Sequence, residues 1–452
     1  MSTTSLPSYV APVLSQNHGR APSYNAERPS YERRIAVADH REPRALGLFV
    51  KQSKSVALHL FDQEDGISLP VYSTGDNVKG EVRLSKPENV TNVEVKIEGR
   101  LRLKEIAEGG TTTAKLCLDT DSLWLKAESS GPCPAILPFS LQLPNHFECE
   151  GETVPLPPTY DVKLSGVPGF NATIEYSISV LVDKPHSGAS IVPLVKTTLF
   201  GSSSNAAIST HFQYYPRTRP ATAPPPPLLL TQHGFSEHPE WQAFDSMIHA
   251  KSGNLQDITT VLYIPKSRVF CMNEPIPFHV MFRSSAISLA SFMPYCPSTS
   301  TTSTERMTKI QLLRQSTVDV RNTEVQGTKT DMWRLDAVGE GIFRVAGDGP
   351  DFIAYSGEIT IDSSVKVAGF KAAGLSVKDC IVLSMTPPEP QKSPFGELRL
   401  LAPIQLTTDA WAADGAGSTN GHGAGNGANG NGNGTYRDDD SIFKDPNYFQ
   451  GV

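Results

Sequence analysis

Hydrophobic and polar residues alternate with a period of two through long parts of the middle of the chain. Between positions 93 and 103 the odd positions are apolar apart from Gly99, while the even positions from Glu94 to Lys104 are all charged. Residues 174–182 alternate in the same way. A strand with one face on a core and the other in water sorts residues like this, whereas a helix scatters both sets around its circumference. Both segments are therefore predicted to be antiparallel strands.

Further runs have the length, the β-branched or aromatic content and the flanking turn residues of strands. They cover residues 56–61, 77–84, 135–143, 191–200, 258–264, 276–282, 310–320 and 377–385. A short helix is predicted only at residues 238–250, HPEWQAFDSMIHA. Strands joined by Gly, Pro, Asn and Asp turns, without intervening helices, indicate sandwiches instead of βαβ units. The predicted fold class is all-β, with two tandem antiparallel immunoglobulin-like β-sandwich domains.

Composition sets the expected boundaries of these domains. The start of the chain is rich in Ser, Pro, Ala and Arg, and the end is rich in Gly and Asn, so both are predicted to be disordered. The Pro-rich run YPRTRPATAPPPP at 215–227 interrupts the strands, because proline cannot donate to a ladder. The expected order is a head at 1–45, a sandwich at 46–205, a connection at 206–255, a sandwich at 256–411 and a tail at 412–452.

Charge and cysteine content narrow the classes of partner. The 40 Lys and Arg against 47 Asp and Glu give a net charge of −7, which offers no field that attracts nucleic acid. No run approaches the ~20 apolar residues that span a bilayer, so we expect a cytoplasmic protein without a transmembrane segment, and peripheral membrane association stays open. The six cysteines are scattered without a CxxC pair; reduced thiols are expected, with no metal and no cofactor.

Enzyme signatures are missing from the sequence. It contains no GxSxG, HExxH or GxxxxGK[ST] motif, and residues 75–80 have the glycine spacing of a phosphate loop but Glu81 at the lysine position. We therefore expect a protein that is not an enzyme. A β-sandwich hydrolase, with a site assembled from distant residues, is one alternative.

A succession of strand-and-turn segments resembles a known family. Residues 72–102 hold a turn with Gly75 and Asp76 and a strand that ends in Gly99 and Arg100. They are followed by LPFSLQLP at 137–144, LPPTYDV at 156–162 and IEYSISVLV at 174–182. This order resembles the N-domain of arrestins. Residues 278–282, 310–320 and 378–411, the last containing PIQLTTDAW, resemble the C-domain of fungal arrestin-like proteins.

The resemblance, to alpha-arrestins of the arrestin-related trafficking adaptor type, implies a cytosolic adaptor. Such a protein docks on the cytoplasmic tails of membrane transporters or receptors and brings a ubiquitin ligase to them for ubiquitination and endocytosis, at the plasma membrane or endosomes. The fold alone does not fix this function. A structural subunit of an endosomal sorting coat, similar to the arrestin-like component of retromer, would use the same sandwiches without recruiting a ligase.

The head contains three related tetrapeptides, LPSY at 6–9, APSY at 21–24 and RPSY at 28–31. WW domains, such as those of HECT-class ubiquitin ligases, bind PPxY and more weakly LPxY, because proline presets an extended left-handed coil and tyrosine fills a neighbouring slot. Linked weak sites gain avidity, although chance co-occurrence in a biased segment is the alternative. The candidate WW-ligand residues are Leu6, Pro7, Tyr9, Pro22, Tyr24, Pro29 and Tyr31.

Two further proline motifs fall elsewhere in the chain. Pro157, Pro158 and Tyr160 match the WW pattern literally as PPTY, but the segment leads into a strand, so we expect Tyr160 to be packed. The run PPPP at 224–227 is read as a stiff spacer in preference to an SH3-type ligand.

Overall fold

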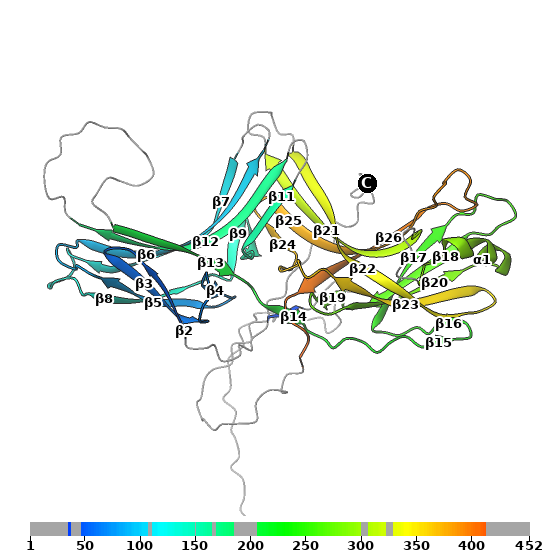
Figure 1. Cartoon of the computed structure of the whole chain (residues 1–452), viewed down its shortest axis with the longest axis horizontal. Helices are drawn as coiled ribbons and strands as arrows, with labels where there is room; N and C mark the ends of the chain where they lie inside the picture. Colours follow the sequence, from blue (N-terminus) through cyan, green and yellow to red (C-terminus); the bar gives the residue numbers. More distant parts are fainter. Residues whose placement is uncertain are drawn as a thin grey trace, which may run out of the picture. The chain divides into compact units, whose positions relative to one another are not determined.

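The computed structural model describes residues 35–37, 47–106, 111–149, 151–164, 169–184, 206–299, 306–321 and 329–412. All of them lie within one compact part of the chain, Arg33–Tyr436. The strand predicted at 191–200, most of the head and the tail beyond residue 412 lie outside them. The described residues confirm the all-β fold class, with sheets arranged as sandwiches (Figure 1).

In the first half of the chain, two sheets enclose one hydrophobic core. One has the order β2-β3-β5-β8, formed by β2 (Gly47–Gln52), β3 (Val56–Gln63), β5 (Asn77–Leu84) and β8 (Ile136–Gln142). The other has the order β4-β13-β12-β6-β7 with β11 beside β12, formed by β4 (Val71–Tyr72), β13 (Ala206–Tyr214), β12 (Phe170–Asp183), β6 (Asn92–Glu105), β7 (Thr111–Leu125) and β11 (Tyr160–Leu164). A hairpin of β9 (His146–Cys149) and β10 (Glu152–Pro155) forms a separate two-stranded sheet and contributes Phe147 to the same core.

The two segments with the clearest alternation in the sequence are paired with each other. Strands β6 and β12 run antiparallel along their whole lengths, from Asn92 opposite Asp183 to Glu105 opposite Phe170. The apolar side chains of both strands are buried, as at Val95 and Val180. A shift by one residue would turn every one of them to solvent, so the hydrophobic pattern fixes this register.

In the second half, one sheet curves around a second core. Its order is β17-β18-β20-β23-β22-β21-β25-β26-β19, with β24 beside β25. The strands are β17 (Trp241–Ile248), β18 (Ile258–Pro265), β19 (Val269–Cys271), β20 (Ile276–Arg283), β21 (Thr308–Arg321), β22 (Lys329–Asp348), β23 (Phe352–Ile361), β24 (Phe370–Ala372), β25 (Leu375–Met385) and β26 (Leu398–Thr407). Val318, Ala372 and Leu375 of this half belong to the first core.

The helix predicted at residues 238–250 is wrong. Strand β17 occupies this segment and pairs with β18 from Trp241 opposite Pro265 to Ile248 opposite Ile258. The alternation was hard to read because Gln242 and Ser246 are polar residues on the less exposed face. Tertiary pairing outweighs local helix propensity here.

The one α-helix among the described residues lies where the sequence suggested no element. Helix α1 (Ala286–Phe292) follows β20 and continues into a 3-10 turn, η1 (Met293–Tyr295). The hydroxyl of Ser285 caps it by accepting a hydrogen bond from the Ser288 amide. Seven residues are too few to show a helical period in the sequence.

Two strands change the picture of the head and the connection. Strand β13 lies within residues 206–255, yet it pairs with β12 as part of the first sandwich. Strand β1 (Ile35–Val37) lies within the head and pairs with β14 (Thr218–Pro220) in the connection. A three-residue strand has no periodicity to read, so the sequence could not predict β1.

Gly99 packs where a side chain does not fit, which provides a test of the β6–β12 core. A Cβ atom at Gly99 would lie 2.5 Å from the ring of Tyr176. That ring cannot retreat freely, because its hydroxyl donates a 2.6 Å hydrogen bond to the carbonyl of Pro157. We expect Gly99→Ala to lower the free energy of unfolding by about 1–3 kcal/mol, measured by urea denaturation.

The matched control is Gly131→Ala, because nothing lies within 4 Å of a Cβ atom there. This variant is expected to change stability by no more than about 0.5 kcal/mol. Equal effects of the two substitutions would contradict the packing described for Gly99.

Candidate functional site

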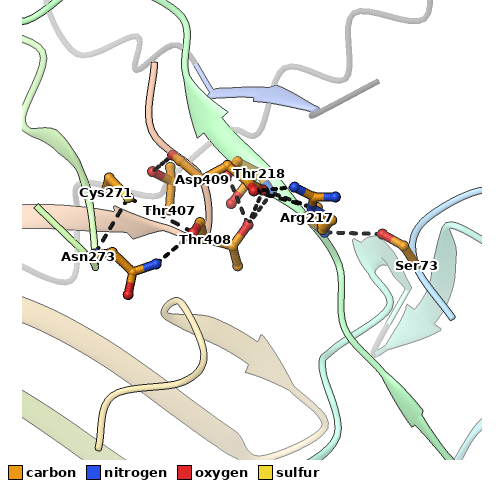
Figure 2. Close-up of polar contacts among 8 residues, drawn as sticks. All are labelled: Ser73, Arg217, Thr218, Cys271, Asn273, Thr407, Thr408 and Asp409. Atoms are coloured by element: carbon orange, nitrogen blue, oxygen red, sulfur yellow. Dashed lines mark hydrogen bonds and ion pairs between the residues drawn. The ribbon is translucent and has the colours of Figure 1, made fainter. Parts of the chain in front are cut away.

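The Pro-rich connection is bonded to several distant parts of the chain around β14, and this junction is the candidate functional site (Figure 2). On the side of the first sandwich, the backbone amide of Arg217 donates to the hydroxyl of Ser73 at 3.3 Å. Ser73 belongs to the turn between β4 and β5. On the side of the second sandwich, the partners are the residues that follow β26.

Thr218 uses both of its backbone groups on those residues. Its amide donates to the hydroxyl of Thr408 at 2.8 Å, and its carbonyl accepts from the amide of Asp409 at 2.9 Å. The Thr408 hydroxyl also lies 3.0 Å from the Thr218 carbonyl. The hydrogen-bonding groups on one edge of β14 are therefore satisfied by the residues that follow β26.

The other edge of β14 faces β1. Consecutive residues of a strand direct their amide and carbonyl groups to opposite edges, so the backbone groups of Arg219 point away from Thr408. Its partner in the antiparallel register is Ala36, and Thr218 and Pro220 stand opposite Val37 and Ile35. The connection thus holds a segment of the head on one edge and the end of the second sandwich on the other.

An ion pair reinforces the junction. The guanidinium Nε of Arg217 lies 3.2 and 3.1 Å from the two carboxylate oxygens of Asp409, and Nη2 contacts Oδ1 as well. Burial opposes ionisation of Asp409, but the hydrogen bonds from Arg217 and Thr408 outweigh it and hold the pKa of this carboxyl below its ordinary value. The carboxylate is charged at neutral pH.

Side chains from β19 and the turn after it support the end of β26. Asn273 Nδ2 donates to the Thr408 carbonyl at 3.5 Å, and the Thr407 hydroxyl lies 3.2 Å from the carbonyl of Phe270. Burial raises the pKa of the Cys271 thiol above its ordinary value, in spite of a hydrogen bond from Asn273. A thiol that stays protonated is a structural group and a poor nucleophile.

The turn that carries Ser73 explains one landmark of the sequence. Gly75 has a φ of 75°, in the left-handed region that favours glycine. The buried Asp76 accepts a 2.7 Å hydrogen bond from the Ser73 amide through its carboxylate. Both residues shape the turn that carries Ser73.

The candidate WW-ligand residues fall in two groups. Those of the head, from Leu6 to Tyr31, lie outside the described residues. Pro157 and Pro158 are buried, and the ring of Tyr160 stacks edge-on against Phe370 with centroids 5.1 Å apart. Burial raises the pKa of Tyr160. Tyr160 is packed, as expected.

Sequence reasoning did not predict two ion pairs of the described residues, Arg217–Asp409 and Arg314–Asp379. Arg217 and Asp409 are separated by 192 positions, and neither lies in a periodic segment. The buried pair of Arg314 and Asp379 leaves a sequence pattern that could have been recognised. Each charged residue occupies a position on the inward face of its strand, where alternation predicts an apolar residue. Two opposite charges in such positions predict partners, because an isolated buried charge is too costly.

No family model matches the chain, and none of the curated proteins matches it. The class that the described residues define is therefore that of the fold, an all-β protein with sandwich-like sheets. All six cysteines are free. In the described part of the chain, no three His, Cys, Asp or Glu side chains are grouped as metal ligands, and no helix has the length and apolar character to cross a bilayer.

The ion pair provides a test of the junction. We expect Asp409→Asn to speed amide hydrogen exchange at residues 217–219 by roughly fivefold, since a hydrogen bond to a charged group that is partly exposed contributes about 1 kcal/mol. Exchange in β12 should not change. The control is Glu358→Gln, the same chemical change in the exposed pair with Arg344, where surface ion pairs contribute little. Unchanged exchange at 217–219 in Asp409→Asn would contradict a closed junction.

The same pair predicts a pH dependence with a defined sign. Because the pKa of Asp409 is lowered in the folded protein, the stabilisation is present in full above the ordinary aspartate pKa of about 4. It declines below that value and is lost as the pH falls through the folded-state pKa. We expect urea midpoints of the wild type and of Asp409→Asn to differ at pH 7 and to converge in acid. A difference that grows in acid would contradict this assignment.

Proposed function

We propose that this protein is a non-enzymatic adaptor that links membrane-protein cargo to a WW-domain ubiquitin ligase of the HECT class. The folded sandwiches bind the cytoplasmic tail of a transporter or receptor, and the head binds the ligase. Both interactions bring the protein to the plasma membrane or endosomes. No residue of the chain has to make or break a bond for this function.

The observation that carries the proposal is the pairing of β1 with β14. It attaches the head to the connection directly after the three tetrapeptides, since Tyr31 precedes Ile35 by only four residues. A ligand on the head is thereby tied to the body between the two sandwiches. A ligase domain held there meets a bound cargo within one assembly.

Chain length limits the reach of this tether. Tyr9 precedes Ile35 by 26 residues, which is at most about 90 Å of extended chain. That span is comparable with the dimensions of a two-domain protein, so an attached ligase remains within range of lysines on a bound tail. The arrangement raises the effective concentration of the ligase without any additional contact.

The test measures binding of the full chain to an array of isolated WW domains. Tyr9, Tyr24 and Tyr31 are changed to Ala singly and together. Each single change is expected to weaken binding several-fold and the triple change to abolish it, because linked weak sites act through avidity. Saturable binding that depends on these tyrosines supports the ligase adaptor.

Two controls make the outcome specific. Tyr436→Ala removes a tyrosine of the tail that has no proline two positions before it, and it should bind as the wild type does. Tyr160→Phe leaves the packed ring in place and should also bind normally. Full binding by the triple variant, or no binding by the wild type, contradicts ligase recruitment through the head and favours the coat-subunit alternative.

A further inference from the structure

The four prolines at 224–227 have a backbone conformation that their chemistry dictates. Each ring fixes φ near −65°, and Pro224, Pro225 and Pro226 each also precede a proline, which excludes the helical range of ψ. What remains is the polyproline II helix, with three residues per turn. Residues three positions apart therefore share one of its three edges.

One edge of this helix is bound to the second sandwich. Pro225 is half-buried and Leu228, three positions later, is buried. The indole Nε1 of Trp241 donates a 2.8 Å hydrogen bond to the carbonyl of Pro226. The amide of Leu228 donates to Nε2 of His279 at 3.4 Å.

The bound edge lies against a cluster of aromatic rings. The rings of Trp241 and Phe235 each lie 4.7 Å from the ring of His279, between centroids. His279 is further fixed by Ser356, whose hydroxyl lies 2.7 Å from Nδ1. Burial lowers the pKa of His279 to about 4, so at neutral pH the imidazole is uncharged and can accept the Leu228 amide.

The other two edges are exposed to solvent. Ala223, Pro226 and Leu229 form one of them, and Leu229 is 74% exposed. Pro224 and Pro227 form the other and are also exposed. A spacer would need no such division, in which one edge is buried and hydrogen-bonded at Leu228 and two apolar edges face water.

This division matches the way in which SH3-type domains read a polyproline II helix. Their aromatic-lined grooves accept two edges of the ligand, as two x-Pro pairs separated by one residue, and the third edge points away. In the segment A-P-P-P-P the pairs are Ala223–Pro224 and Pro226–Pro227, and the residue between them is Pro225. We propose that residues 223–227 are a presented ligand for an SH3-type domain, held by Leu228 on its third edge and by the Trp241 hydrogen bond to the Pro226 carbonyl.

Holding the ligand should increase its affinity. A free peptide must be ordered when it binds, whereas here the proline rings and the Trp241 contact have fixed the conformation in advance. This site is independent of the adaptor function proposed above, since it uses neither the head nor a WW domain.

The experiment measures binding of the full chain to a panel of isolated SH3 domains. We expect at least one domain to bind saturably, and Pro224→Ala and Pro227→Ala each to weaken that binding about tenfold. The control is Pro225→Ala, which removes an identical ring from the bound edge and should change the affinity by less than about threefold. Urea midpoints verify that each variant is folded.

A second measurement compares the full chain with a synthetic peptide of residues 220–232. The full chain should bind the same SH3 domain at least about threefold more tightly than the peptide. No binding by the full chain would overturn the proposal. It would also be overturned if Pro225→Ala lost as much affinity as the two edge variants, or if the peptide bound more tightly than the chain, because the run would then be blocked.

Discussion

The structure of the junction depends on the need of β14 to satisfy the backbone groups on both of its edges. A strand of three residues has no stability of its own, and it persists because other segments complete it. One edge is bonded to Thr408 and Asp409, and the other is paired with β1. Positions near 36, 218 and 408 are thus brought together, although nothing in the sequence connects them. The connection is therefore bonded both to β1, at the end of the head, and to the residues that follow β26.

A second constraint lies inside the C-terminal sheet, where Arg314 and Asp379 are opposite each other on β21 and β25. Their side chains are 8% and 1% exposed, with two bonds of 2.8 and 2.9 Å between them. Arg314 also donates to the carbonyl of Val367 at 2.9 Å. A buried pair adds little net stability, but any other register would leave each charge buried alone at a cost of several kcal/mol. The pair therefore selects one alignment of β21 and β25.

The sequence was sufficient for those parts of the fold where one face of a strand is buried. Strands β6 and β12 were predicted from alternation, because the buried face excludes every charge. The same reasoning failed at β17, where Gln242 and Ser246 occupy the less exposed face and only pairing with β18 decides the conformation. It failed at β1 and at Arg217 for a different reason. Three residues carry no period, and a contact across 192 positions leaves no local pattern.

The run at 223–227 lies close to Ile35 through the pairing of β1 with β14, and this closeness would restrict how the two proposed peptide ligands could be used together. Pro220, which is opposite Ile35, and Pro224 are four positions apart, a span of at most about 14 Å. A small domain of about 60 residues is roughly 27 Å across. A domain bound at residues 223–227 would therefore occupy the space around β1 and would exclude a second domain from Tyr31. Under both proposals, the 26 positions between Tyr9 and Ile35 would let a domain bound at Tyr9 clear that volume, so simultaneous binding would favour the most distant of the three tetrapeptides.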